Sequence, residues 1–284
     1  MIASPKTLSF LAAGITPVFG FCGGHTYLDK RAEGVNISAF GYAGIDGPVL
    51  WHHLVPANAL CGTGSNQSPI NLVEGTYTIV PGSDLKVTLP GTVADGATFE
   101  NLGSTIEVVT EGLKGSLVLE GQSYELKQFH WHHPGEHLDN NVSMPMEMHL
   151  VFLSDKQQTA VIGIFVDLVD STSSNAAESY PTDTSSAMLE TIFSSVDKIA
   201  APGTTTKTAA FSMTELSDLI DSADFRRYSG SLTSPPCTEG VTWSVATKKL
   251  ALSRTTFAKV REVIGFNSRF PQNTPGMPNL LVLC

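Results

Sequence analysis

The sequence predicts a mainly β (α+β) domain with a few short surface helices. Short apolar runs follow one another closely between residues 77 and 126, and Gly and Pro residues separate them, which is typical of strands joined by turns. The apolar segments Met146 to Leu153 and Val161 to Leu168 also have strand length. Apolar residues recur at helical spacing near residues 188–196 and 257–264, which predicts two short helices packed on the sheet.

Other stretches have the composition of loops. Gly and Pro punctuate residues 40–51, which favours loop and short turns there. Residues 170–186 are rich in Ser and Thr, so we expect a solvated loop, with Ser185 or Ser186 capping the following helix.

Composition bounds the function. The chain has 284 residues, of which 42% are hydrophobic and 15% charged, and its formal net charge is −10. This length allows one or two domains with a large core. The negative charge makes nucleic acids and acidic membrane surfaces poor partners, because both are also negative.

The first 31 residues resemble a secretory leader. Lys6 precedes an apolar run from Leu8 to Phe21 that Gly and Pro interrupt, so it is too short and broken for a membrane span. Lys30-Arg31 resembles a dibasic propeptide site. We expect residues 1–31 to be removed as signal peptide plus propeptide, leaving residues 32–284 as a secreted, extracellular domain without a membrane span.

Secretion would permit disulfides and glycans. The chain has four cysteines, which allow three sets of disulfide pairs: Cys22, Cys61, Cys237 and Cys284. Cys22 lies in the expected leader. Three asparagines head weak glycosylation sequons: Asn36, Asn66 and Asn141.

Three histidines on two expected strands predict a metal site. His130 and His132 are two residues apart, so they point to the same face of a strand. His149 lies far enough along the chain for its strand to return antiparallel beside the first. Three neutral nitrogens without a nearby Cys are typical of catalytic zinc, which keeps one ligand position open.

Neighbouring residues support this reading, and alternatives remain. Gln128 and Glu147 each lie two residues before an expected ligand, so they could orient the rings. A polar loop with five histidines is one alternative. A closed zinc-storage site is another, with His133 or His137 as fourth ligand, although His133 should face the opposite side of the strand from His132.

These residues resemble a known family. The runs Gln128-Phe129-His130-Trp131-His132, Glu136-His137 and Glu147-Met148-His149-Leu150-Val151 are similar to the zinc signature of the α-class carbonic anhydrases. His133 places the resemblance nearer to the bacterial, plant and fungal branches than to the animal enzymes. Further similar stretches extend it to residues 40–272: Phe40-Gly41-Tyr42, Gln67-Ser68-Pro69, Gly230-Ser231-Leu232-Thr233-Ser234-Pro235-Pro236, Val241-Thr242-Trp243 and Asn267-Ser268-Arg269.

The resemblance implies a fold and an activity. The fold would be one domain with a large central, mostly antiparallel twisted sheet and a central cleft. The activity would be reversible hydration of CO2 to bicarbonate and a proton, by attack of hydroxide on a Zn2+ ion held by His130, His132 and His149. Esterase activity could accompany it. A non-catalytic binding domain of the same fold would typically lack a zinc ligand, and none is missing here.

The resemblance also implies roles for individual residues. Thr233 and Glu136 would orient the nucleophile by a hydrogen-bond chain. Gln128, Glu147 and Asn267 would orient the histidine rings. A hydrophobic CO2 pocket would be formed by Val151, Val161, Leu232 and Trp243. Tyr42 and Ser104 would lie near the mouth, and Cys61 and Cys237 would form a disulfide. The oligomeric state is not indicated by the sequence.

One position departs from the family. Fast animal enzymes carry a proton-transferring His in an Asn-x-Gly-His stretch, whereas this chain has Asn101-Leu102-Gly103-Ser104. Because Ser104 cannot hold a proton near pH 7 and His can, we expect slower proton export or another carrier. The sequence offers His52, His53 and His137 without placing any of them at the mouth.

Overall fold

A computed structural model of the chain describes residues 35–110, 112–169 and 184–282. The expected leader, Cys22, Cys284 and most of the Ser/Thr-rich loop lie outside these residues. Within the described part of the chain, no helix is both long and apolar enough to cross a membrane.

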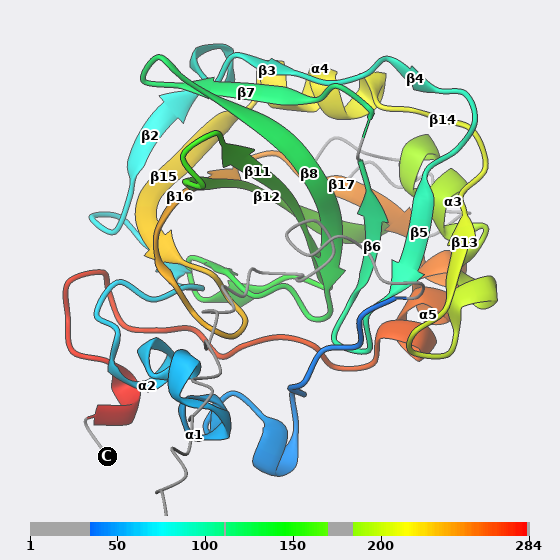
Figure 1. Cartoon of the computed structure of the whole chain (residues 1–284). Coiled ribbons are helices and arrows are strands. Elements are labelled where there is room, and N and C mark those ends of the chain that lie inside the picture. The colour runs from blue at the N-terminus through cyan, green and yellow to red at the C-terminus, as the bar shows by residue number, and fades with distance from the viewer. Residues whose placement is uncertain (1–34, 111, 170–183, 283–284) are drawn as a thin grey trace, which may run out of the picture.

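A curved twelve-stranded sheet forms the body of the protein (Figure 1). Its main order is β13-β5-β6-β8-β11-β12-β16-β15-β2, while β17 pairs with β12, and β7 pairs with β3 and β8. The strands are β2 (Thr78–Pro81), β3 (Val87–Thr88), β5 (Thr98–Asn101), β6 (Ile106–Val109), β7 (Ser116–Leu119), β8 (Gln122–His132), β11 (Met146–Ser154), β12 (Thr159–Val169), β13 (Thr205–Lys207), β15 (Asp224–Ser231), β16 (Glu239–Ala246) and β17 (Leu250–Ser253).

Most neighbouring strands run antiparallel, which confirms the fold class. The exceptions in the large sheet are β16 and β17, which both pair parallel with β12. Five short strands form two small accessory sheets: β1 (Asn71–Leu72), β9 (Leu138–Asp139), β10 (Val142–Ser143), β4 (Thr92–Val93) and β14 (Phe211–Ser212).

The central strands β11 and β12 are buried on both faces. Every residue of β11 is buried, as are the first eight of β12, and strands covered on both faces read as near-continuous apolar runs. The polar residues Glu147 and His149 of β11 therefore lie where unpaired polar groups are costly. They need partners, and the site described below provides them.

The helices are short and lie around the sheet. The two predicted helices correspond to α3 (Ala187–Phe193) and α5 (Arg254–Ile264). Ser186 caps α3, because its side-chain oxygen accepts a hydrogen bond from the Leu189 N–H. The other helices are α1 (Trp51–Leu54), α2 (Leu60–Thr63) and α4 (Thr214–Ser222), with 3-10 turns η1 (Gly44–Asp46), η2 (Pro56–Asn58), η3 (Gly82–Asp84), η4 (Val196–Ile199) and η5 (Leu280–Val282).

A buried disulfide joins the N-terminal helices to the loop after β15. Cys61 of α2 and Cys237 are fully buried, with Cα atoms 5.0 Å apart and a sequence separation of 176. Closing so long a loop stabilises the fold by about 4–5 kcal/mol in the chain-entropy model. The bond fixes the segment that carries Thr233 against the N-terminal part of the domain.

Candidate metal centre

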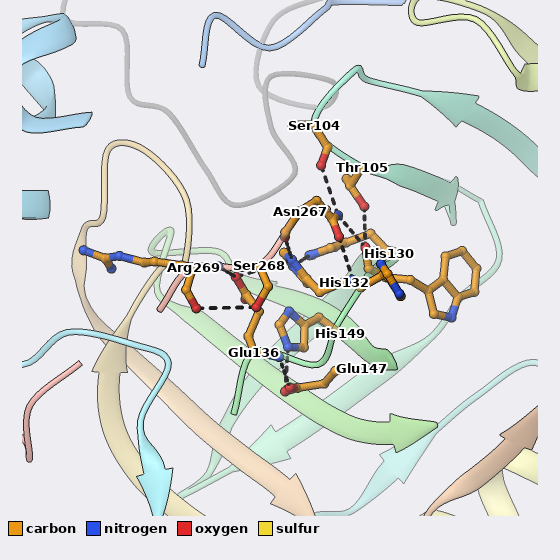
Figure 2. Close-up of polar contacts among 12 residues, drawn as sticks. Ser104, Thr105, His130, His132, Glu136, Glu147, His149, Asn267, Ser268 and Arg269 are labelled. Atoms are coloured by element: carbon orange, nitrogen blue, oxygen red, sulfur yellow. Dashed lines mark hydrogen bonds and ion pairs between the residues drawn. The ribbon is translucent and has the colours of Figure 1, made fainter. Parts of the chain in front are cut away.

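The pairing of β8 with β11 brings the three predicted histidines together. Cα partners in this antiparallel ladder are His149 with His130, and Glu147 with His132. Residues two apart share a face, so all three rings project to one side of the sheet. Their ligand atoms lie within 4.8 Å of one another, and all three residues are buried (Figure 2).

Each ring donates one N–H to a fixed oxygen. The three donations are from His130 Nδ1 to Gln128 Oε1 at 2.8 Å, from His132 Nδ1 to the Asn267 carbonyl at 2.7 Å, and from His149 Nε2 to Glu147 Oε1 at 2.8 Å. Such contacts fix the tautomer and orientation of metal-binding histidines. The second nitrogen of each ring is left without a proton as long as the ring is neutral.

Burial keeps these rings neutral. Desolvation lowers the pKa of His132 to about 4 and holds the pKa of His130 well below its usual value, and the pKa of His149 is lowered for the same leading reason. The charge of Glu147 opposes the shift at all three rings but does not reverse it.

Three bare nitrogens therefore face one another. The Nε2 atoms of His130 and His132 are 3.2 Å apart, and neither ring has a proton to place between them. His149 Nδ1 is buried without a hydrogen-bond partner among the described residues. Converging lone pairs are unfavourable unless a cation neutralises them, and neutral imidazole is a preferred zinc ligand. The donor set fits zinc.

Glu147 anchors this arrangement. Its Oε1 also accepts from His137 Nδ1 at 2.6 Å, and its Oε2 accepts from the backbone N–H groups of Glu136 and His137, both at 2.8 Å. Desolvation raises the pKa of Glu147, but the electrostatic effects of His137 and His149 and the hydrogen bonds from their rings outweigh it and hold the pKa well below its usual range. The carboxylate is thus ionised and fully used, so the second conceivable metal group, His137, Glu147 and His149, is better explained as a hydrogen-bond network.

The two histidines weighed as a fourth ligand have other partners. His137 is fully buried and continues the network, because its Nε2 accepts from the Tyr228 hydroxyl at 2.7 Å. His133 is turned away, since its Nδ1 donates to the Gly265 carbonyl at 2.9 Å and its ring packs near Phe257. These contacts favour an open three-histidine site over a closed one.

Asn267 ties the C-terminal segment to the site. Besides accepting from His132 through its carbonyl, it donates from Nδ2 to the carbonyls of Ser104 at 3.0 Å and Trp131 at 2.9 Å. Its Oδ1 accepts from the His133 N–H at 2.6 Å. Figure 2 shows this amide beside the rings, where it fixes the end of β8 on two sides.

Glu136 and Thr233 lie together next to the histidines. Both are buried, and the Thr233 hydroxyl hydrogen-bonds the Glu136 carboxyl group. Glu136 Oε1 also accepts from the Arg269 N–H at 2.9 Å. Desolvation raises the pKa of Glu136 to about 7, although His149, the Thr233 hydroxyl and the Arg269 N–H act in the opposite direction.

The four predicted apolar residues gather in one cluster. Val151 and Val161 are Cα partners across β11 and β12, Val161 pairs in turn with Trp243 of β16, and Leu232 joins them. The Trp243 ring centroid lies 4.8 Å from that of His149. An apolar wall therefore reaches the histidines directly.

The two residues expected near the mouth have definite contacts. Ser104 is buried, its hydroxyl lies 2.6 Å from the Ser38 hydroxyl, and its carbonyl accepts from Asn267. Tyr42 packs edge-to-face with Phe40 and Trp51 in a separate aromatic cluster.

Sequence reasoning gave no role to several residues that complete the site. Tyr228 and Ser68 extend the Glu147–His137 network, because the two hydroxyl oxygens are 2.8 Å apart. Arg269 donates to the carbonyls of Ser68 and Cys61 at 2.7 and 3.0 Å while its N–H holds Glu136. Arg269 lies in the stretch Asn267-Ser268-Arg269, and the similarity of this stretch to the family was the sequence signal that could have identified it.

Comparisons with known proteins agree on one family. The family model described as eukaryotic-type carbonic anhydrase matches residues 46–275. A carbonic anhydrase of Neisseria gonorrhoeae is 33% identical over 221 residues, covering 78% of each chain. The solved fungal α-carbonic anhydrase from Aspergillus oryzae is 35% identical, with a TM-score of 0.77 and coverage of 87% of this chain and 98% of its own. The Thermovibrio ammonificans α-carbonic anhydrase, solved with sulfanilamide, is 33% identical, with a TM-score of 0.70 and coverage of 84% and 96%.

Replacing Glu147 by Gln should weaken metal binding. The amide can still accept from His149, but it lacks the charge that holds the ring's proton on Nε2, and loss of such a partner typically costs about 10–100-fold in metal affinity. Competition with a chelator measures the zinc affinity. Glu125→Gln is the matched control, because Glu125 lies on β8, the strand paired with that of Glu147, but forms an exposed pair with Lys127; equal affinities in the two variants would contradict the role of Glu147.

Proposed function

Because the chain belongs to the eukaryotic-type, or α-class, carbonic anhydrase family, we propose that His130, His132 and His149 hold the zinc ion with which it works. The enzyme catalyses the reversible hydration of CO2 to bicarbonate and a proton. The observation that carries the ligand assignment is the convergence of three unprotonated ring nitrogens, one of them buried without a partner.

Zinc supplies a nucleophile at neutral pH by lowering the pKa of water to about 7, an effect for which carbonic anhydrase is the standard example. The protein supplies neutral ligands, so the full charge of the ion remains available for this purpose. Gln128, Glu147 and the Asn267 carbonyl keep the rings in place by accepting their outer protons.

Thr233 and Glu136 orient the attacking oxygen in this proposal. Thr233 donates its hydroxyl proton to the Glu136 carboxylate, so its own oxygen can only accept. An incoming water must therefore donate to Thr233 and turn its lone pairs elsewhere. The arrangement requires Glu136 to be ionised, and a cation beside it favours ionisation because opposite charges lower a carboxyl pKa.

The apolar cluster provides a dry surface for CO2. Val151, Val161, Leu232 and Trp243 are each at most 2% exposed, and Trp243 borders His149. CO2 is apolar and forms no strong hydrogen bonds, so such a wall can hold it without competing for the oriented nucleophile. Bicarbonate is charged and is poorly solvated there, which favours its release.

Replacing Thr233 by Ala should reduce kcat/KM for CO2 hydration roughly 100-fold, the usual cost of one positioned hydrogen-bonding group. Stopped-flow hydration assays measure the change, with zinc content determined in parallel to show that the metal site is intact. Thr238→Ala is the control, because Thr238 lies in the same loop but is exposed. Full activity in Thr233→Ala would refute this assignment.

Ser104 leaves the site without the proton-carrying His of the fast animal enzymes. Its hydroxyl is paired with Ser38, and His137, the nearest alternative in sequence, is buried in the Glu147 network. We expect turnover to rise strongly with the concentration of an imidazole-type buffer, because the buffer must collect the proton. A kcat that does not change with buffer concentration would show that the protein has its own carrier.

The same proposal includes secretion. Residues 1–31 would be removed and residues 32–284 would act outside the cell, where the Cys61–Cys237 disulfide is stable. Asn36 and Asn141 are exposed and could carry glycans, whereas Asn66 is partly buried and its N–H is bound to Glu239. Mass spectrometry of the secreted protein should find Ala32 at the N-terminus; an intact leader on active extracellular protein would contradict this processing.

A further inference from the structure

An open cavity of about 500 Å³ lies over β2, β15 and β16. Its floor is built from cross-strand partners, Thr78 with Arg227 and Ser229 with Thr242. Paired residues, and residues two apart on one strand, share a face of the sheet, so these four side chains lie on one surface. Loop residues complete the wall: Asn66, Gly75, Thr76, Tyr77 and Pro275.

This cavity is separate from the metal centre. None of its lining residues belongs to the three-histidine group. Tyr228 is the one lining residue that also takes part in the Glu147–His137 network. The volume of the cavity lies in the range of about 300–1,000 Å³ that small-molecule sites usually have.

The charge of the cavity comes from Arg227. It is the only lining residue with a formal charge at pH 7, and no carboxylate lines the cavity. Its Nη2 atom is buried without a hydrogen-bond partner among the described residues, and its Nε makes only a long contact of 3.4 Å to Ser244. The Arg227 side chain is half-buried, and a partly desolvated guanidinium without an acidic partner gains from an anion that pairs with it.

The neighbouring Arg226 also has one buried nitrogen without a hydrogen-bond partner, Nη1, but its charge is paired. Arg226 forms an ion pair with Asp139 at 2.9 Å and lies over the Tyr77 ring at 5.8 Å from its centroid. Its charge is therefore compensated by the protein itself. Of the two adjacent arginines, only Arg227 lines the cavity and lacks an acidic partner in the described part of the chain.

We propose that this cavity binds a small aromatic monocarboxylate, with Arg227 as its charge anchor. The planar guanidinium matches a carboxylate through two parallel hydrogen bonds. A single cationic side chain favours a singly charged ligand over a more highly charged one. Tyr77 offers a ring face or edge to an aromatic ligand, and the hydroxyl groups of Thr78 and Thr242 stand on the same floor for further hydrogen bonds.

Benzoate is the probe for this site. Isotope-labelled, zinc-loaded protein is titrated with benzoate, and backbone amide NMR shifts are followed at Thr78, Ser229 and Thr242 and at the three histidines. Because carboxylates also bind metals, the two groups of signals distinguish the cavity from the metal centre. We expect saturable shifts around the cavity, with their own dissociation constant.

Two variants test the anchor. Arg227→Gln should raise the dissociation constant at the cavity roughly 10-fold or more, because it removes a charge-assisted bidentate contact. Arg226→Gln is the matched control on the same strand and should leave the constant within about 3-fold, since its charge is already paired. Thermal melting checks the fold of both variants. If Arg227→Gln fails to fold, Arg227→Lys takes its place. This variant keeps the charge without the planar fork, so its dissociation constant should be intermediate.

Three results would overturn the proposal. The first is the absence of shifts at Thr78, Ser229 and Thr242 at benzoate concentrations that saturate the shifts at the three histidines. The second is an unchanged dissociation constant in folded Arg227→Gln or Arg227→Lys. The third is an equal loss of binding in Arg226→Gln, which would mean that general positive charge, rather than this guanidinium, attracts the ligand.

Discussion

The ionised, fully buried Glu147 carboxylate is the interaction on which the metal centre depends. Four hydrogen bonds converge on its two oxygens, two from imidazole N–H groups and two from the backbone after β8. A buried charge is tolerated only when it is paired and hydrogen-bonded in this way. The same bonds keep the proton of His149 on Nε2, so that Nδ1 is bare on the side of the other two histidines.

The C-terminal segment provides the second fixed edge of the site. Asn267 and Arg269 lie far from β8 in sequence, yet the first holds His132 and the end of β8, and the second holds Glu136. Arg269 also donates to the Cys61 carbonyl, next to the disulfide. The active centre is thus held by strands, the C-terminal segment and the disulfide-linked N-terminal helices together, which explains why residues from most of the chain contribute to it.

Local patterns predicted the part of the site that lies on adjacent strands. The spacing of His130 and His132 fixed their common face, and the two-residue offset identified Gln128 and Glu147 as partners of the rings. The mainly β fold followed from short apolar runs separated by Gly and Pro. Both predictions rest on local features, the two-residue period of a strand and the spacing of apolar runs, which are visible in a single sequence.

Long-range pairing was beyond such patterns. The parallel pairing of β12 with β16 and β17 has no local signature, and α4 escaped notice because only Leu216 and Ile220 of its nine residues are buried. The proposed roles of Thr233 and Asn267 came from the resemblance. For Asn267, a backbone carbonyl that accepts from a ring 135 positions away leaves no trace in composition. The Tyr228 link to His137 likewise depends on tertiary packing.

The most direct test of the account is a titration of metal-free protein with zinc while CO2 hydration is recorded. If three unprotonated imidazole nitrogens form the catalytic site, activity should rise with added zinc and reach a plateau at one ion per chain. Hydration that is already complete without zinc, or one bound zinc per chain without hydration, would contradict the account.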